Sequence, residues 1–259
     1  MAEEIAPEKG EIVLEVGPGE GILTEYLAKS GAQIIAVEKD RRLISVLKEK
    51  FKNQKNVTIV EEDILKFDPA ELRFDLFEDP RSNLGTTVNY KIVGNIPYYI
   101  TSHLLRIILE KWPRPKSILF MVQKEVAERI TTKPPKMNLL ALAVQFYAEA
   151  KILKKVSRNN FRPVPNVDSA LIKIIPKEKT PYSKEFQKNF FKTARACFQN
   201  KRKQILSSLA NNLGLSKTAA EKMLSEAGID PTRRPETLNI EEWVKLAKSL
   251  FPELSSARS

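Results

Sequence analysis

The sequence predicts an α/β fold with a mostly parallel sheet, followed by a small domain made only of helices. Short apolar runs alternate with segments of helical periodicity through the first two-thirds of the chain. Two strand-like segments with no helix between them end this region, which predicts an antiparallel hairpin at the edge of the sheet. From residue 183 onward the apolar residues recur with the helical period alone.

The strands and helices of the first region are expected to follow one another in turn. The predicted strands are short and rich in β-branched residues, at 12–16, 34–37, 57–60, 91–93 and 117–123, with the hairpin at 151–157 and 168–175. The predicted helices carry apolar residues three and four positions apart, at 20–30, from Asp40 onward, and at 100–110, 124–130 and 138–147. Asp40 is a suitable N-cap, and Gly31 is a suitable helix stop.

A polar linker at 176–181 separates this region from the helical one, so we expect domains at 1–176 and 177–259. The polar stretch 75–88 has no clear period and is expected to be a mobile loop. The helices of the second domain end near glycines or polar turns and lie at 183–197, 200–212, 216–227 and 239–250.

The chain of 259 residues has a formal net charge of +11, and this charge is unevenly distributed. Residues 1–176 hold 27 Lys and Arg against 23 Asp and Glu, whereas residues 177–259 hold 16 against 9. The excess in the last third indicates a surface that binds a polyanion such as nucleic acid. A merely basic, well-solvated surface is the alternative.

The presence of only one cysteine and only one histidine argues against several classes of protein. Cys197 is the only cysteine, so no internal disulfide forms and a reducing, cytoplasmic location is expected. His103 is the only histidine and lies at an apparent helix start, where a surface or packing role is expected. We therefore expect neither a metal site nor a histidine-based nucleophilic mechanism. The chain shows neither a signal peptide nor an apolar run of about 20 residues, so no membrane association is expected.

The first predicted strand runs into a glycine-rich turn, Glu15–Gly21. Its glycines let a ligand approach the backbone, but their spacing is not that of a dinucleotide-binding turn. Glu15 and Glu20 would repel a pyrophosphate and suit a ligand that carries a cation. S-adenosylmethionine, with a sulfonium and an amino group and no phosphate, fits this description. Gly17 and Gly19 would then lie against it.

Acidic residues also end the next two predicted strands. Glu38 closes the second strand, where a carboxylate can accept hydrogen bonds from both hydroxyls of a ribose. Asp63 follows the third strand, where it can accept from an adenine amino group, with Ile64 against the ring. Each acid alone could be a solvated strand end, but the ends of parallel strands meet in one crevice.

Asn95–Tyr98, with the sequence Asn-Ile-Pro-Tyr, follows the fourth strand. Asn95 offers an amide oxygen, Ile96 a backbone carbonyl, Pro97 a backbone without a donor, and Tyr98 an aromatic face. Acceptors that pull on the hydrogens of a purine amino group favour a nitrogen lone pair that can attack. The alternative is a strand-to-turn junction with a structural asparagine and a core tyrosine.

Phe161 begins a proline-stiffened segment, Phe161–Ser169, before the last strand. Held in a fixed direction beside Tyr98, its ring would clamp a base that has left its stack. The alternative is a phenylalanine that fills the core.

Together these motifs resemble the ribosomal RNA adenine dimethyltransferase family over residues 11–250. The segments that carry the resemblance are Glu15–Gly21, Glu38, Asp63, Asn95–Tyr98, Phe161–Ser169, Arg195–Lys203 and Arg234–Leu238. The resemblance implies a Rossmann-like class I methyltransferase sheet and N6,N6-dimethylation of adenosines in ribosomal RNA with S-adenosylmethionine. It also implies that Gly17, Glu38, Asp63 and Asn95 line the cofactor. The branch that acts near the 3′ end of small-subunit RNA is the more similar one, which implies the immature small subunit as partner and a monomeric enzyme.

One segment departs from the family pattern. The family has a Gln-Asn-Phe-Leu-like stretch before the first strand that covers the cofactor, and the residues before Ile12 contain no such stretch. Either the sequence is truncated at its start or the protein lacks this segment, and weaker cofactor binding by this chain is expected. Three alternatives stay open: a non-catalytic RNA-binding assembly or transcription factor on the same scaffold, a large-subunit RNA methyltransferase, and a DNA adenine methyltransferase.

The basic run near the end of the first C-terminal helix is the predicted RNA contact. Arg195, Lys201, Arg202 and Lys203 lie at a helix boundary, where they can reach phosphates. The alternative is a solvated helix face.

Overall fold

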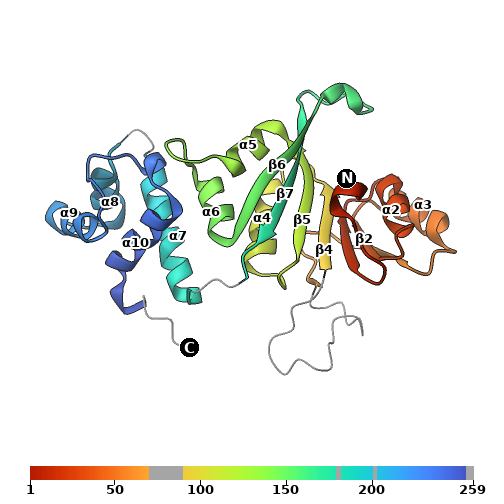
Figure 1. Ribbon diagram of the computed structural model, residues 1–259, viewed down its shortest axis with the longest axis horizontal. Coiled ribbons are helices and arrows are strands. Elements are labelled where there is room, and N and C mark those ends of the chain that lie inside the picture. The colour runs from red at the N-terminus through yellow and green to blue at the C-terminus, as the bar shows by residue number, and fades with distance from the viewer. Residues whose placement is uncertain (70–89, 179–181, 201–202, 255–259) are drawn as a thin grey trace. The chain divides into compact units, whose positions relative to one another are not determined.

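The computed structural model describes residues 1–69, 90–178, 182–200 and 203–254, which divide into two compact units (Figure 1). The first unit comprises residues 1–128 and 147–176, and the second comprises 129–146 and 177–259. The boundary after Pro176 is where the linker was expected. Residues 129–146 were expected in the first domain and instead group with the C-terminal helices.

Among the described residues, the first unit holds a seven-stranded sheet in the order β3-β2-β1-β4-β5-β7-β6. The strands are β1 (Ile12–Val16), β2 (Gln33–Glu38), β3 (Val57–Glu61), β4 (Tyr90–Asn95), β5 (Ser117–Gln123), β6 (Ala148–Val156) and β7 (Ser169–Pro176). β1 to β5 pair in parallel, whereas β7 pairs antiparallel with both β5 and β6 (Figure 1). The predicted α/β class with an antiparallel edge hairpin is confirmed.

The helices form where the apolar spacing predicts them. They are α2 (Ile22–Ala28), α3 (Arg41–Phe51), α4 (Thr101–Glu110), α5 (Lys124–Thr131) and α6 (Leu139–Tyr147). The side chain of Asp40 accepts a hydrogen bond from the backbone N–H of Arg42 at 3.0 Å, which is the expected N-cap of α3. The predicted loop 75–88 lies outside the described residues.

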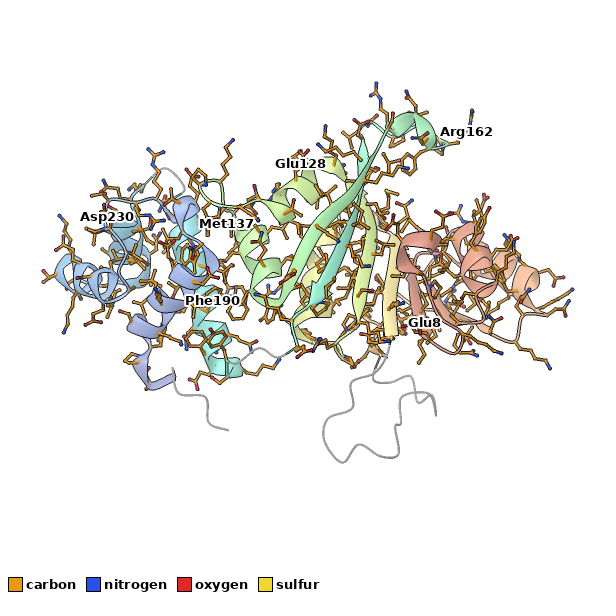
Figure 2. All side chains as sticks on the ribbon, in the orientation of Figure 1. Glu8, Glu128, Met137, Arg162, Phe190 and Asp230 are labelled. Atoms are coloured by element: carbon orange, nitrogen blue, oxygen red, sulfur yellow. The ribbon has the colours of Figure 1, made fainter. Side chains whose placement is uncertain are left out.

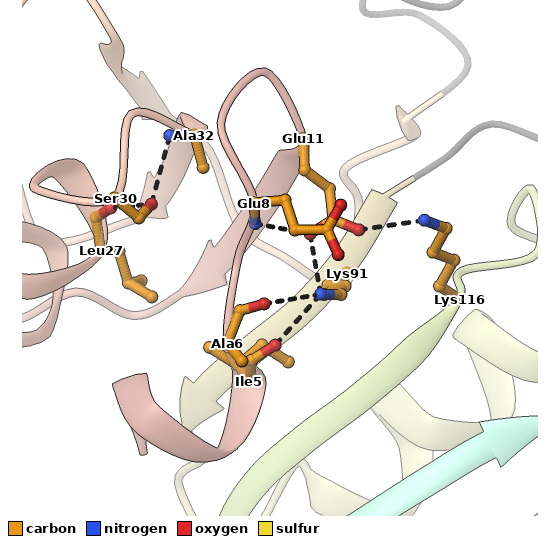
Figure 3. Close-up of polar contacts among 9 residues, drawn as sticks. All are labelled: Ile5, Ala6, Glu8, Glu11, Leu27, Ser30, Ala32, Lys91 and Lys116. Carbon is orange, nitrogen blue, oxygen red and sulfur yellow. Dashed lines mark hydrogen bonds and ion pairs between the residues drawn. The ribbon is translucent and has the colours of Figure 1, made fainter.

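A short helix at the start of the chain, α1 (Ala2–Ile5), was not predicted from the sequence. Figure 3 shows how it is tied down: Lys91 Nζ donates to the carbonyl oxygens of Ile5 (3.1 Å) and Ala6 (3.0 Å). The same ammonium lies 2.7 Å from Glu11 Oε2, and Lys116 Nζ lies 3.2 Å from Glu11 Oε1. Lys91 therefore joins α1 to the start of β4 and to a buried carboxylate.

The strand register brings the functional segments to one edge of the sheet. Val16, the last residue of β1, lies opposite Val37 of β2 and Gly94 of β4. Only glycine fits at position 94, because a Cβ there would lie 2.6 Å from the carbonyl oxygen of Val16. The close approach of β4 to β1 places Asn95 directly beside the turn that follows Val16.

The second unit is helical in its C-terminal part. Its helices are α7 (Lys184–Phe198), α8 (Ile205–Leu213), α9 (Lys217–Glu226) and α10 (Ile240–Leu250). Short 3₁₀ helices lie at Arg158–Asn160 in the first unit and at Pro235–Thr237 and Pro252–Leu254 in the second. Phe146 joins residues 129–146 to these helices, because its ring lies 4.4 Å from that of Phe190 and 5.3 Å from that of Phe191.

One predicted helix begins at the wrong residue. The helix expected at 200–212 begins at Ile205, because Gln204 is extended and the backbone N–H of Ile205 donates to the carbonyl of Arg233 at 2.7 Å. The contact with Arg233 thus lies at the first residue of α8.

Candidate active site

Two cavities of the first unit open at the carboxyl ends of β1 to β4 and share Gly17, Gly19 and Asn95. The large cavity, about 640 Å³, is lined by Met1, Ala2, Glu3, Glu15, Gly17, Pro18, Gly19, Ile22, Leu23, Tyr26, Asn95, Met121 and Phe161. The small cavity, about 250 Å³, is lined by Val16, Gly17, Gly19, Val37, Glu38, Lys39, Glu62, Asp63, Ile64, Leu65, Asn95, Pro97, Tyr99 and Ile100.

The turn between the cavities depends on glycine. Gly17 and Gly19 have φ angles of 63° and 59°, in the left-handed region where other residues are strained. A Cβ added at either position would meet nothing within 4 Å among the described residues. These glycines therefore serve the backbone conformation, and the space beside them is open to a ligand.

Glu15 lies in the wall of the large cavity and is only 1% exposed. Among the described residues, its Oε2 atom has no hydrogen-bond partner. Burial raises the pKa of Glu15 from its ordinary 4.5 to about 7, and the neighbouring Thr24 side chain lowers it by a smaller amount. A buried carboxyl group with an unused oxygen is suited to pair with a cation in the cavity.

Glu38 is held in a fixed orientation at the end of β2. Its Oε1 accepts from the backbone N–H groups of Lys39 and Asp40, both at 2.9 Å. Its Oε2 accepts from the N–H of Gly19 at 3.4 Å, at the edge of the small cavity. The carboxylate therefore faces the space in which a ribose would lie.

Asp63 and Ile64 line the same small cavity, so the structure brings them together with Glu38 as the sequence predicted. Asp63 Oδ1 accepts from the N–H of Leu65 at 3.0 Å, which fixes the turn after β3. Ile64 is buried and presents an apolar surface.

The Asn95–Tyr98 segment divides into residues that face the cavities and residues that do not. Asn95 is exposed and lines both cavities, whereas Pro97 lines the small one. Ile96 is buried, and its N–H donates to the carbonyl of Met121 at 3.0 Å, which anchors the segment to β5. Tyr98 is 38% exposed and lines neither of these two cavities in the described structure.

Phe161 lines the large cavity together with Asn95, although it comes from the distant connection between β6 and β7. The 3₁₀ helix Arg158–Asn160 precedes it, and Figure 2 shows the neighbouring Arg162 at the tip of this connection. The structure thus brings Phe161 to Asn95 and Glu15, while Tyr98 stays outside this group.

Several cavity residues were not identified from the sequence. Ile22 and Tyr26 are apolar residues of the helix predicted at 20–30, but they are 65% and 62% exposed and line the large cavity, whereas Leu27 of the same helix is buried. Lys39 and Tyr99 line the small cavity and were not predicted from the sequence either. Each directly follows a predicted site residue in the chain, and this adjacency is the signal that could have identified them.

The predicted RNA contacts lie in the second unit. Arg195 is exposed on α7, and Lys203 is exposed with its N–H donating to the carbonyl of Asn200 at 2.9 Å. Lys201 and Arg202 lie outside the described residues.

His103 is exposed on α4. Within the described ranges, no three His, Cys, Asp or Glu side chains gather to hold a metal ion, and no helix is long and apolar enough to cross a membrane.

Comparisons with known proteins agree with this geometry. The chain is 47% identical over 234 residues to the ribosomal RNA small subunit methyltransferase A of Dehalococcoides mccartyi, covering 90% of this chain and 77% of that protein. It is 38% identical to the protein of the same name from Bacillus cytotoxicus, covering 96% and 84%.

Two solved structures have a similar fold over most of this chain. The 23S rRNA methyltransferase ErmE superposes with a TM-score of 0.71 at 27% identity, covering 95% of this chain and 94% of that one. A dimethyladenosine transferase from Plasmodium falciparum has the same fold, with a TM-score of 0.77 at 24% identity and coverage of 95% and 91%. The predicted class I methyltransferase fold is confirmed. Because the ribosomal RNA adenine dimethylase family model matches residues 1–251, the chain belongs to that family.

Proposed function

We propose that this enzyme transfers methyl groups from S-adenosylmethionine to N6 of two adjacent adenosines near the 3′ end of small-subunit ribosomal RNA. The observation that carries the proposal is the position of Asn95, which lines the large and the small cavity at once. An amide oxygen at this shared wall can hold an amino group from one cavity against a ligand that extends from the other.

The residues present fit S-adenosylmethionine. Glu38 and Asp63 in the small cavity offer acceptors for ribose hydroxyls and an adenine amino group, and Ile64 offers an apolar face. Oε2 of Glu15 in the large cavity has no hydrogen-bond partner in the described part of the chain, which suits the cationic end of the same molecule. When bound, this cofactor supplies an electrophilic methyl group on a sulfonium.

The chain itself supplies position and hydrogen-bond acceptors. We infer that Asn95 and the backbone carbonyl of Ile96 accept from the hydrogens of the target amino group, which makes its lone pair available. Phe161 provides one ring face for the adenine, and Tyr98 is the proposed second face. Catalysis then arises mainly from orientation, which contributes on the order of several kcal/mol in such reactions.

The assignment to small-subunit RNA is supported by the relatives. Proteins named small subunit methyltransferase A are 38–47% identical to this chain, whereas the 23S rRNA methyltransferase above is 27% identical. The proposed partner is the immature small ribosomal subunit, and the enzyme is proposed to be monomeric and cytoplasmic. Exposed Arg195 and Lys203, with Lys201 and Arg202, are the proposed phosphate contacts.

Transfer of tritiated methyl groups to under-methylated small subunits tests the proposal. We expect Asn95→Ala to lower kcat by at least about 100-fold, the typical cost of one transition-state hydrogen-bond partner. Asn53→Ala, which changes an exposed asparagine between α3 and β3, should match the wild type. Equal incorporation by wild type and Asn95→Ala would remove Asn95 from its role. Labelling of large but not small subunits would refute the substrate assignment.

A further inference from the structure

Two exposed side chains meet at the small cavity in a contact that the site residues above do not require. Lys39 directly follows β2, and Tyr99 lies between β4 and α4. Lys39 Nζ donates to the Tyr99 hydroxyl at 3.2 Å and lies 5.7 Å from the centre of the tyrosine ring. Both residues line the small cavity.

The contact between Lys39 and Tyr99 connects segments that follow two strands that are not neighbours in the sheet. β2 and β4 lie on opposite sides of β1, so the connections that follow them flank the turn that contains Gly17 and Gly19. A contact between Lys39 and Tyr99 therefore passes over that turn and joins the two sides of the cavity. Because Lys39 and Tyr99 are exposed, the crossing lies on the solvent side.

Core packing does not account for the contact. Tyr99 is 76% exposed, so its ring contributes little to the buried interior. Lys39 is exposed and is held instead by the Tyr99 hydroxyl and ring, a combination of hydrogen bond and cation–π attraction. Tyr99 first, then Asp63 and Glu38, raise the pKa of Lys39 above its ordinary value.

We propose that Lys39 and Tyr99 form a strap across the mouth of the small cavity that slows release of an adenosine-bearing ligand. The inference rests on the proposed function, because it takes that ligand to be S-adenosylmethionine or its product S-adenosylhomocysteine. Lys39 and Tyr99 are positioning residues: the strap retains the ligand, whereas Asn95 and Phe161 act on the substrate.

Release rates test the strap directly. The wild type, Lys39→Met, Tyr99→Phe and the double variant are loaded with S-adenosylhomocysteine and chased with excess S-adenosylmethionine in a stopped-flow instrument. We expect each single substitution to raise the release rate about threefold to fivefold, the scale of one exposed charged contact. The double variant should release no faster than Lys39→Met alone, because that substitution already removes both the hydrogen bond and the cation–π contact. The KM for S-adenosylmethionine should rise by a similar factor without a fall in kcat.

Lys248→Met is a matched control, because Lys248 Nζ lies 5.7 Å from the ring centre of Tyr182 in the second unit. It should release the ligand at the wild-type rate. Wild-type release rates in both single variants, or effects that multiply in the double variant, would overturn the strap. Failure of the wild type to bind either ligand would instead refute the proposed cofactor, and the strap with it.

Discussion

At Glu15 the fold places a carboxyl group that is only 1% exposed in the wall of the large cavity and leaves one oxygen without a partner among the described residues. Such a group costs stability when it is charged, and a ligand that brings a cation removes that cost. Position 94 is restricted by space rather than by charge, since only glycine lets β4 approach Val16. Glu15 thus makes one wall of the site suitable for a cationic ligand, whereas Gly94 allows β4 to pack closely against β1.

The pH dependence of stability follows from the pKa of Glu15. A carboxyl pKa raised from 4.5 to about 7 means that the folded state binds more protons than the unfolded state between these pH values. Stability of the ligand-free protein therefore falls as pH rises from about 4.5 to about 7. We expect Glu15→Gln to be more stable than the wild type at pH 8, by on the order of 3 kcal/mol, and equal to it at pH 4.

Urea unfolding at the two pH values measures this difference. Glu20→Gln, an exposed change in the same turn, is the control and should show no such pH-dependent gain. A gain from Glu15→Gln that is the same at pH 4 and pH 8 would contradict the assignment. Calorimetric titration should also show weaker binding of S-adenosylmethionine, because an amide cannot neutralise a cation.

At the scale of elements, α1 depends on a buried ion pair rather than on its own length. Four residues cannot sustain a helix, but Met1, Ala2 and Glu3 line the large cavity while Lys91 holds the other end of α1. Burial acts to raise the pKa of Glu11, but Lys91, the Glu8 N–H and Lys116 outweigh it and lower the pKa. This contribution to stability is present above pH 4.5 and is lost as pH falls below that value.

Removal of the Lys91 ammonium should therefore destabilise the first unit. We expect Lys91→Met to lower the free energy of unfolding by about 3 kcal/mol, because it leaves a buried carboxylate with a weaker partner. Lys116→Met should cost less than about 1 kcal/mol, since that side chain is half exposed. Urea unfolding at pH 7 compares them, and equal losses would show that Lys91 is not the main anchor.

Element boundaries show where sequence patterns stop being informative. Asp40 capped α3 as predicted, because a side-chain cap is a local interaction. The start of α8 was predicted five residues early, because the carbonyl that fixes Ile205 belongs to the distant Arg233. Helix α1 gave no signal, since four residues contain no measurable period.

On the scale of the whole molecule, the excess of basic residues and the candidate active-site cavities lie in different parts of the chain. The cavities belong to the first unit, whereas the basic excess lies in residues 177–259. This division suits an enzyme whose substrate is a large polyanion, because phosphate contacts fix the position of the RNA and the cavities select the base.

Neutralising the basic run should change how RNA binding depends on salt. We expect replacement of Lys201, Arg202 and Lys203 by Gln to reduce the slope of log K against log salt concentration by about 2, because each phosphate contact contributes roughly 0.7 to 0.9. Filter binding of small-subunit RNA between low and moderate salt measures the slope. A triple Gln variant of the exposed Lys217, Lys222 and Lys245 is the control. An unchanged slope in the first variant would place the RNA contact elsewhere.

The sequence by itself determined the order of strands and helices, the glycine turn, and the acids at the strand ends, because these depend on period, caps and chain order. Glu15, Glu38, Asp63 and Asn95 could be expected together for the same reason: the carboxyl ends of parallel strands meet at one edge. Only the tertiary structure decided that Phe161 reaches the large cavity while Tyr98 does not line it, and that Lys39 meets Tyr99. Lys39 and Tyr99 are 60 positions apart, Phe161 is even further from Glu15 in the chain, and no local pattern encodes the direction in which an exposed side chain turns.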